Sequence, residues 1–345
     1  MALKNNPNLR LAELEVEKAQ ILRDDAYDYV DYFPTEGVVT LAFNQVFNAY
    51  QQAEIGLNTA KRAKLAARDQ LTKDVIAAYT EALTNYNNMK SMELTLKNTR
   101  DLHTVSSVAG KVGFISAYDF DSSITGLQQA EEGYRAAQLT YEGSIANLGS
   151  LLGQHPDWDP VLTSNALITT YERGDLSSDI IHGSSESVLV WTKEALLDIE
   201  KSKENWILPE LTSEERKIDM STAELNYEDA KRTSRVLIEQ MYYGIDTIEG
   251  QIKLAELAYE KALKDQEVAQ LKYDLGLIPR LTLTPGAESL ESKILAVSQA
   301  NTNLCNLKLQ LANLKAQYAF MIGEDVFEEA DWTAPPVVAN ETEKL

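Results

Sequence analysis

The sequence predicts an all-α protein made of two tandem copies of a long antiparallel helical hairpin, with little or no β structure. Three observations predict this fold class. Turn formers are scarce, with only 16 Gly and 9 Pro among 345 residues, whereas all-β proteins need many turns. Apolar residues recur at heptad spacing. Two glycine-centred turn segments repeat at a fixed distance, which indicates an internal duplication.

A heptad stripe runs through the second half of the chain, with steps that alternate between three and four residues. Its members are Ile238, Met241, Ile245, Ile248, Ile252, Ala255, Tyr259, Ala262, Ala269 and Tyr273. A helix over 238–273 extends about 54 Å at ~1.5 Å per residue. A helix of that length needs neighbours along its whole length, because the mean globular helix has only about 11–12 residues.

The same stripe reappears in weaker form 163 residues earlier, from Val75 to Thr99, and the offset also relates Gly113 to Gly276. After these glycines the offset becomes 170, which relates the apolar stripe 127–151 to 297–321. The difference of seven residues is one heptad, which we place between about Asp119 and Leu127 in the frame of the first half. A heptad insertion preserves the apolar face. Each half is therefore predicted to be a helix, a turn at the glycine and a returning helix.

Shorter helices are predicted before each hairpin, over 9–25 and 187–206, and a proline follows each of them. A segment rich in Pro, Gly, Ser and Asp separates the two halves. The predicted organisation is a first repeat over 1–155, a connector over 156–185, a second repeat over 186–324 and a C-terminal tail over 325–345.

Composition argues against several classes of function. The formal net charge of −21 repels a phosphate backbone, so nucleic acid is not an expected partner. The only cysteine is Cys305, which excludes an intrachain disulfide and a multi-cysteine metal site. His103, His155 and His182 lie in separate segments without ligand spacing, and no phosphate loop or nucleophile motif occurs. We expect no enzyme activity, no cofactor and no metal. The printed chain contains neither a signal peptide nor a membrane-spanning apolar run.

Several segments together resemble the outer-membrane efflux (TolC) family over about residues 2–324. They are the opening Ala2–Leu9, the turns Gly113–Asp119 and Leu275–Ile278, and the repeat ends Leu151–Gly153 and Met321–Gly323. The resemblance implies a coiled-coil α-barrel protomer. Three such chains form a homotrimer in which six hairpins close into a twelve-helix conduit.

The resemblance also implies partners and a location. The partners are a membrane-fusion-type adaptor protein and an inner-membrane pump of the ABC or RND type, as in efflux and type I secretion systems. The expected location is extracytoplasmic, in the cell envelope, at the outer membrane or in the periplasm. An alternative from another class is a soluble coiled-coil scaffold or spacer of the envelope that conducts nothing.

The chain departs from the family where membrane β-strands are expected. The stretch 209–217 is too short and too charged for two strands of about 9 to 11 residues. The stretches 27–33 and 38–43 could form one small hairpin, or their tyrosines could instead pack between helices. We expect the membrane strands to be absent or vestigial.

The candidate site residues lie at the two hairpin tips. The predicted adaptor contacts are Gly113, Phe114, Ile115, Ser116, Asp119, Gly276, Leu277, Ile278, Pro279 and Arg280. The candidates for a pore constriction are Asp119, Asp121 and Thr282, although Asp119 has the alternative of a helix cap. The resemblance implies acidic residues that ring the pore six and nine positions after the turn glycine of the second repeat. Thr282 and Pro285 occupy those positions here, which argues against such a gate.

One further feature concerns assembly. Leu254, Leu257, Ala258 and Leu271 lie off the heptad positions and form a second apolar seam. A two-helix hairpin needs only one seam, so the other is expected to face another repeat or subunit. The many acidic residues are explained most simply as solvated faces. An acidic lumen that favours cationic solutes is the alternative.

Overall fold

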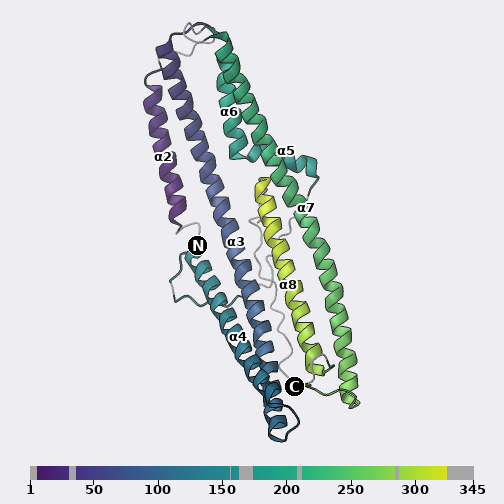
Figure 1. The fold of residues 1–345 in the computed structure, drawn as a ribbon. Coiled ribbons are helices and arrows are strands. Elements are labelled where there is room, and N and C mark those ends of the chain that lie inside the picture. The colour runs from purple at the N-terminus through teal and green to yellow at the C-terminus, as the bar shows by residue number, and fades with distance from the viewer. Residues whose placement is uncertain are drawn as a thin grey trace, which may run out of the picture.

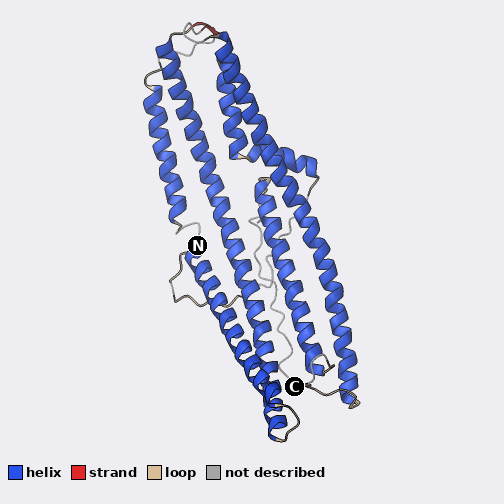
Figure 2. Ribbon diagram, viewed as in Figure 1, coloured by secondary structure: helices blue, strands red, loops and turns tan. Residues whose placement is uncertain are grey.

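A computed structural model describes residues 6–30, 36–155, 157–162, 174–207, 212–283 and 287–324. The described chain is almost entirely helical (Figure 2), which confirms the predicted fold class. Its helices are α2 (Pro7–Tyr27), α3 (Leu41–Lys111), α4 (Ala117–Leu152), α5 (Leu176–Glu186), α6 (Val188–Ser202), α7 (Ser213–Asp274) and α8 (Leu290–Met321). Its strands are β1 (Gly37–Val38) and β2 (Trp206–Ile207).

The duplication is visible in the order of the elements. The first repeat runs α2–β1–α3–α4 and the second runs α6–β2–α7–α8. In the elongated molecule the α3–α4 turn and the α7–α8 turn lie at the same end, and the strands lie at the opposite end (Figure 1). The equivalent strands pair in parallel, with Gly37 opposite Trp206 and Val38 opposite Ile207. The equivalent strands pair in parallel because the two repeats lie side by side and run in the same direction.

Side-chain caps define where the long helices start. Thr40 begins α3 by accepting a hydrogen bond from the amide of Phe43 at 3.3 Å. Three helices begin with a reciprocal capping box, in which the cap side chain and the side chain three residues later each bond the other's backbone amide. These boxes begin α4, α7 and α8.

Most of the second-half heptad stripe is buried or half-buried as predicted, but Tyr273 at its end is 39% exposed. Ile238 and Ile245 are fully buried with Tyr318 and Ile322 in one cluster, and Ile252 packs with Ala255 and Leu304 in a second cluster. These clusters join α7 to α8 along the hairpin.

The first-half stripe is weaker because α3 has two long partners. α3 packs against α4 within its own hairpin and against α8 of the second repeat. Ile76, which lies off the predicted stripe, is buried against Ala316 and Ala319 of α8. A helix with two partners buries more than one face, so a single heptad stripe does not describe it.

The structure places the predicted seven-residue insertion in the second connection rather than within a helix. Five residues separate Lys111 from Ala117 at the first turn, whereas fifteen separate Asp274 from Leu290 at the second. The second connection is thus ten residues longer: seven are the inserted heptad, and the other three arise because α8 starts at Leu290, three residues after the position equivalent to Ala117. The apolar register survives because the connection lies outside both helices.

Of the two alternatives for 27–33 and 38–43, the small β-hairpin is not formed within the described residues. Tyr27 ends α2, and Leu41 and the two residues after it form the first turn of α3. The alternative of helix-packing tyrosines fits better, since the rings of Tyr27 and Tyr50 lie 5.6 Å apart. Residues 31–35 lie outside the described residues.

Part of the predicted connector is helical. α5 occupies 176–186 and packs against α7. The carboxylate of Asp179, which is 6% exposed, accepts a hydrogen bond from the Tyr318 hydroxyl at 2.6 Å. The predicted helix 187–206 ends at Ser202, and Trp206 lies in β2 instead. The predicted tail 325–345 lies outside the described residues. No described helix combines the length and the apolar character that crossing a bilayer requires.

Candidate docking site at the hairpin tips

The first tip is a tight turn fixed by its glycine. Gly113 has φ +78°, a conformation that costs other residues about 1–2 kcal/mol. Its amide donates to the carbonyl of Gly110 at 3.2 Å, and the amide of Phe114 donates to the carbonyl of Ala109 at 2.9 Å. These two bonds form a Schellman motif that satisfies the last carbonyls of α3.

This turn presents aromatic side chains to solvent. Phe114 is 83% exposed and Tyr118 is 80% exposed. Ile115 is half-buried instead. Its side chain lies close to Gly110, since a Cβ added to that glycine would lie 3.9 Å from the Ile115 Cγ1 atom. Exposed aromatic residues are enriched among the anchors of protein interfaces, so the first tip has the chemistry of a docking surface.

Asp119 takes the capping role that the sequence allowed as its alternative, as the capping-box partner of Ser116, the N-cap of α4. Its carboxylate accepts hydrogen bonds from the Ser116 amide at 3.3 Å and from the Ser116 hydroxyl at 2.7 Å. The Asp119 amide in turn donates to the Ser116 hydroxyl at 3.1 Å. Asp121 lies two residues further along α4, and its side chain is exposed. Of the two carboxylates, Asp119 is the one committed to the start of α4.

The second tip uses the same turn. Gly276 has φ +70°. Its amide donates to the carbonyl of Tyr273 at 2.9 Å, and the amide of Leu277 donates to the carbonyl of Lys272 at 2.8 Å. Leu275 and Leu277 are 74% and 70% exposed. The two tips are therefore alike in backbone geometry, but the most exposed apolar side chains are leucines here and aromatic residues at the first tip.

The longer connection returns to α8 along a defined path. The amide of Leu290 donates to the carbonyl of Pro279 at 3.3 Å, and the amide of Glu291 donates to the carbonyl of Arg280 at 3.1 Å. The side chains of Arg280 and Glu291 also form a 2.8 Å ion pair. The hydrogen bond to Glu291 raises the pKa of the Arg280 guanidinium above its usual value.

A second ion pair ties this connection to α7. Lys272 and Glu288 lie 2.7 Å apart, and the hydrogen bond from Lys272 lowers the pKa of the Glu288 carboxyl. Ile278 and Thr282 are half-buried, and Pro285 lies outside the described residues. No sequence pattern predicts these two ion pairs, because charged residues occur throughout the helices and only the return path of the chain brings these four together.

The tip residues form two separate groups at one end of the molecule. The first group, at the α3–α4 turn, contains Gly113, Phe114, Ile115, Ser116 and Asp119. The second group, at the α7–α8 turn, contains Gly276, Leu277, Ile278, Pro279 and Arg280. Figure 1 shows both turns at the same end. Within the described ranges, no three His, Cys, Asp or Glu side chains are placed to hold a metal ion.

Comparison with known proteins shows which solved structures share this fold. No family model and no curated protein matches the chain. Among solved structures, the outer membrane protein VceC from Vibrio cholerae aligns with TM-score 0.62 at 15% identity, covering 94% of this chain and 95% of that one. CusC, described with transmembrane channel formation, aligns with TM-score 0.67 at 14% identity, covering 94% and 90%. The MtrE outer membrane channel of Neisseria gonorrhoeae aligns with TM-score 0.64 at 14% identity, covering 94% and 88%.

The chain has the fold of the outer-membrane channels. The resemblance to the TolC family that the turn segments indicated is therefore shown for the fold. The solved proteins that share this fold are described as membrane proteins and channels rather than enzymes. At 13–15% identity the likeness establishes architecture, and function has to be argued from the chain's own surfaces.

Proposed function

We propose that the chain is the conduit component of an envelope export system, in the outer membrane or periplasm. Three copies form a passive α-helical tube, to which each copy contributes two hairpins, one from repeat 1–155 and one from repeat 186–324. The tips dock onto a membrane-fusion-type adaptor, and an inner-membrane pump of the ABC or RND type drives transport. The likeness in fold to outer-membrane channels supports the conduit role.

The observation that carries the proposal is the second apolar seam on α7, formed by Leu254, Leu257, Ala258 and Leu271. The three leucines are 68%, 63% and 64% exposed, and Ala258 is also exposed. The seam lies opposite the face of α7 that packs on α8. Water-exposed leucines along one helix face indicate a protein contact that a single copy does not make. A second copy of the chain is the partner that closes a tube.

The tips support the docking part of the proposal. Both turns lie at one end, both close with the same hydrogen bonds, and both expose apolar side chains (Figure 1). Since Asp119 is engaged in its cap, Asp121 is the more suitable of the two carboxylates for a pore constriction.

The mass of the purified chain in solution tests the tube. Size-exclusion chromatography with multi-angle light scattering of the 38.5 kDa chain should give a particle three times heavier over a range of loading concentrations. A particle of monomer mass at tens of micromolar would contradict the tube and would favour the scaffold alternative.

In-cell photocrosslinking tests the docking. A photoreactive residue placed at Phe114 or Tyr118 should crosslink to an adaptor protein encoded with a pump. The matched control is Tyr29, which is 74% exposed and follows α2 at the opposite end of the molecule. Equal crosslinking from all three positions, or none to an adaptor, would contradict the docking surface.

A further inference from the structure

The four long helices form a row, and the two edges of this row carry different side chains. α4 packs on α3, α3 packs on α8, and α8 packs on α7. In the half of the molecule that contains the turns, α4 and α7 are therefore the outer helices (Figure 1). A ring of such rows brings α7 of one copy beside α4 of the next, whereas α7 beside α7 is a twofold contact that does not close a ring.

The exposed face of α7 follows a second heptad, opposite the heptad that packs on α8. Its members are spaced three and four residues apart, and all of them are exposed: Leu254, Leu257, Lys261, Lys264, Val268 and Leu271. We call these six residues the outer heptad of α7. A heptad of this kind is the contact surface of a coiled coil, so a partner helix should pack along it.

Two positions in the middle of the outer heptad of α7 are charged. Lys261 and Lys264 form no ion pair within the described residues, since the ion pairs along this part of α7 join Glu249 and Glu256 to α8 instead. A polar residue at a core position of a coiled coil fixes its register and its partner. A charge that is buried without an opposite charge is strongly unfavourable. The partner helix must therefore place an acidic or polar layer beside these lysines.

The exposed face of α4 supplies such a layer. Opposite the apolar stripe 127–151, its exposed residues are also spaced three and four apart, and they are Ser122, Thr125, Gln129, Glu132, Ala136 and Leu139. Gln129 and Glu132 occupy the middle of this outer heptad of α4. The neighbouring Glu131, rather than Glu132, pairs with Arg100 of α3. Most of the flanking residues are small, so they leave room for the leucines of α7.

The two charged layers lie at similar distances from the turns. Lys261 is thirteen residues before Asp274, the last residue of α7, and Glu132 is fifteen residues after Ala117, the first residue of α4. These separations are about 20 Å and about 23 Å at ~1.5 Å per residue. Rotation about the axis of a tube keeps each residue at the same height, so Lys261 of one copy meets α4 of the next copy near Glu132.

From these observations we propose that α7 of each copy packs antiparallel on α4 of the next copy, and that the charged layer selects this edge. Lys261 pairs with Glu132, and Lys264 donates to the Gln129 carboxamide. Contact between α7 and α7 of another copy leaves both lysines without an acidic partner, because the outer heptad of α7 contains no carboxylate. This inference rests on the proposed tube and names the surface that the α7 seam contacts.

Sedimentation velocity of charge variants of the full chain tests the pairing. Lys261→Glu and Glu132→Lys should each raise the dissociation constant of the interface by about tenfold or more, because each brings like charges together. The variant that combines both changes should return to within about threefold of the unmodified chain, since the opposite charges are only exchanged. Lys253→Glu is the matched control, because Lys253 is an exposed lysine of α7 outside the outer heptad, and it should leave assembly unchanged.

Photocrosslinking of the purified full chain identifies the neighbouring helix. Benzoylphenylalanine at position Leu257 should crosslink to α4 of another copy near Ala136, as read by mass spectrometry of the crosslinked peptides. Thermal unfolding of each charge variant checks that the fold is kept, and all the substituted side chains are exposed.

The possible failures are distinguishable. A trimer that crosslinks to α7 or to another helix in place of α4, or a combined variant that assembles no better than the single variants, would overturn this pairing and leave the tube standing. A chain that stays monomeric at tens of micromolar would contradict the tube itself, and this inference with it.

Discussion

Placing charges on the α7 seam should dissociate the proposed trimer. Leu254 and Leu257 are 68% and 63% exposed in the single chain, so a neighbouring copy has about two thirds of each side chain left to bury. Full burial of a leucine contributes about 1.5–3 kcal/mol, which gives about 2–4 kcal/mol for the pair at each interface. At about 1.4 kcal/mol per factor of ten, the double change Leu254→Asp with Leu257→Asp raises the dissociation constant of each interface about 30-fold to 1,000-fold.

Sedimentation velocity over a concentration series measures this effect. The double aspartate variant should sediment as a monomer at concentrations where the unmodified chain is a trimer. Leu254→Met with Leu257→Met is the matched control, because it keeps the seam apolar at similar volume, and it should remain trimeric. Far-ultraviolet circular dichroism should be unchanged, since neither leucine is part of the buried core. A double aspartate variant that stays trimeric with the same dissociation constant would refute the seam as the contact.

Three further predictions concern the fold. Tyr318→Phe removes the 2.6 Å hydrogen bond to the buried carboxylate of Asp179 and should lower the free energy of unfolding by about 1–3 kcal/mol in urea titrations; an unchanged value would contradict this contact between α5 and α8. Two hydrogen bonds from Thr212 lower the pKa of Glu215, the larger contribution from its backbone amide and the smaller from its side chain. The stability from this cap is therefore present above the unfolded-state pKa of Glu215 and is lost as pH falls through its folded-state pKa. Titration by NMR should show Thr212→Ala returning the Glu215 pKa part of the way toward its usual value, since alanine keeps the backbone hydrogen bond, and a Glu215 pKa equally low in this variant would exclude the Thr212 hydroxyl as a cause. Gly276→Ala should increase hydrogen exchange at the second tip, because φ +70° costs other residues about 1–2 kcal/mol, and exchange as slow as before would show that the turn is not under this constraint.

The features that the sequence predicted correctly are those set by local periodicity. Burial of Ile238 and Ile245 follows from the heptad stripe, because α7 has one long partner within its hairpin. The turns at Gly113 and Gly276 follow from the left-handed conformation that ends each helix. The cap at Asp119 also follows from its position three residues after Ser116.

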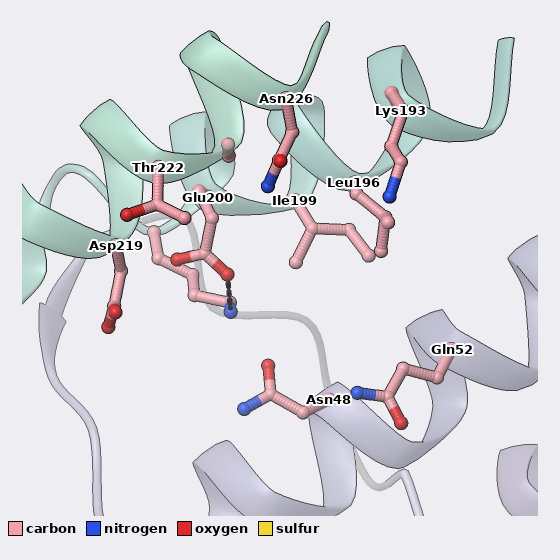
Figure 3. A pocket seen from close by; sticks show the side chains of 11 residues that line it. Asn48, Gln52, Lys193, Leu196, Ile199, Glu200, Asp219, Thr222 and Asn226 are labelled. Atoms are coloured by element: carbon pink, nitrogen blue, oxygen red, sulfur yellow. Dashed lines mark hydrogen bonds and ion pairs between the residues drawn. The ribbon is translucent and has the colours of Figure 1, made fainter. Parts of the chain in front are cut away.

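The features that the sequence missed depend on contacts between distant segments. Burial of Ile76 depends on α8 of the other repeat, and no single-helix pattern contains that information. The change of seven residues between the two repeat offsets shows that the second half contains an insertion, but it does not show whether the inserted residues form helix or loop. A cavity between α3, α6 and α7 is lined mostly by polar residues such as Asn48 (Figure 3), and these residues resemble any solvated face in the sequence.

The conduit proposal is tested most directly by electron cryomicroscopy of the purified full chain. We predict a hollow, threefold-symmetric tube of twelve helices, with the α7 seam against a neighbouring copy and all hairpin turns at one end. Separate elongated monomers, or a closed bundle in which the seam of Leu254, Leu257, Ala258 and Leu271 faces solvent, would contradict the proposal.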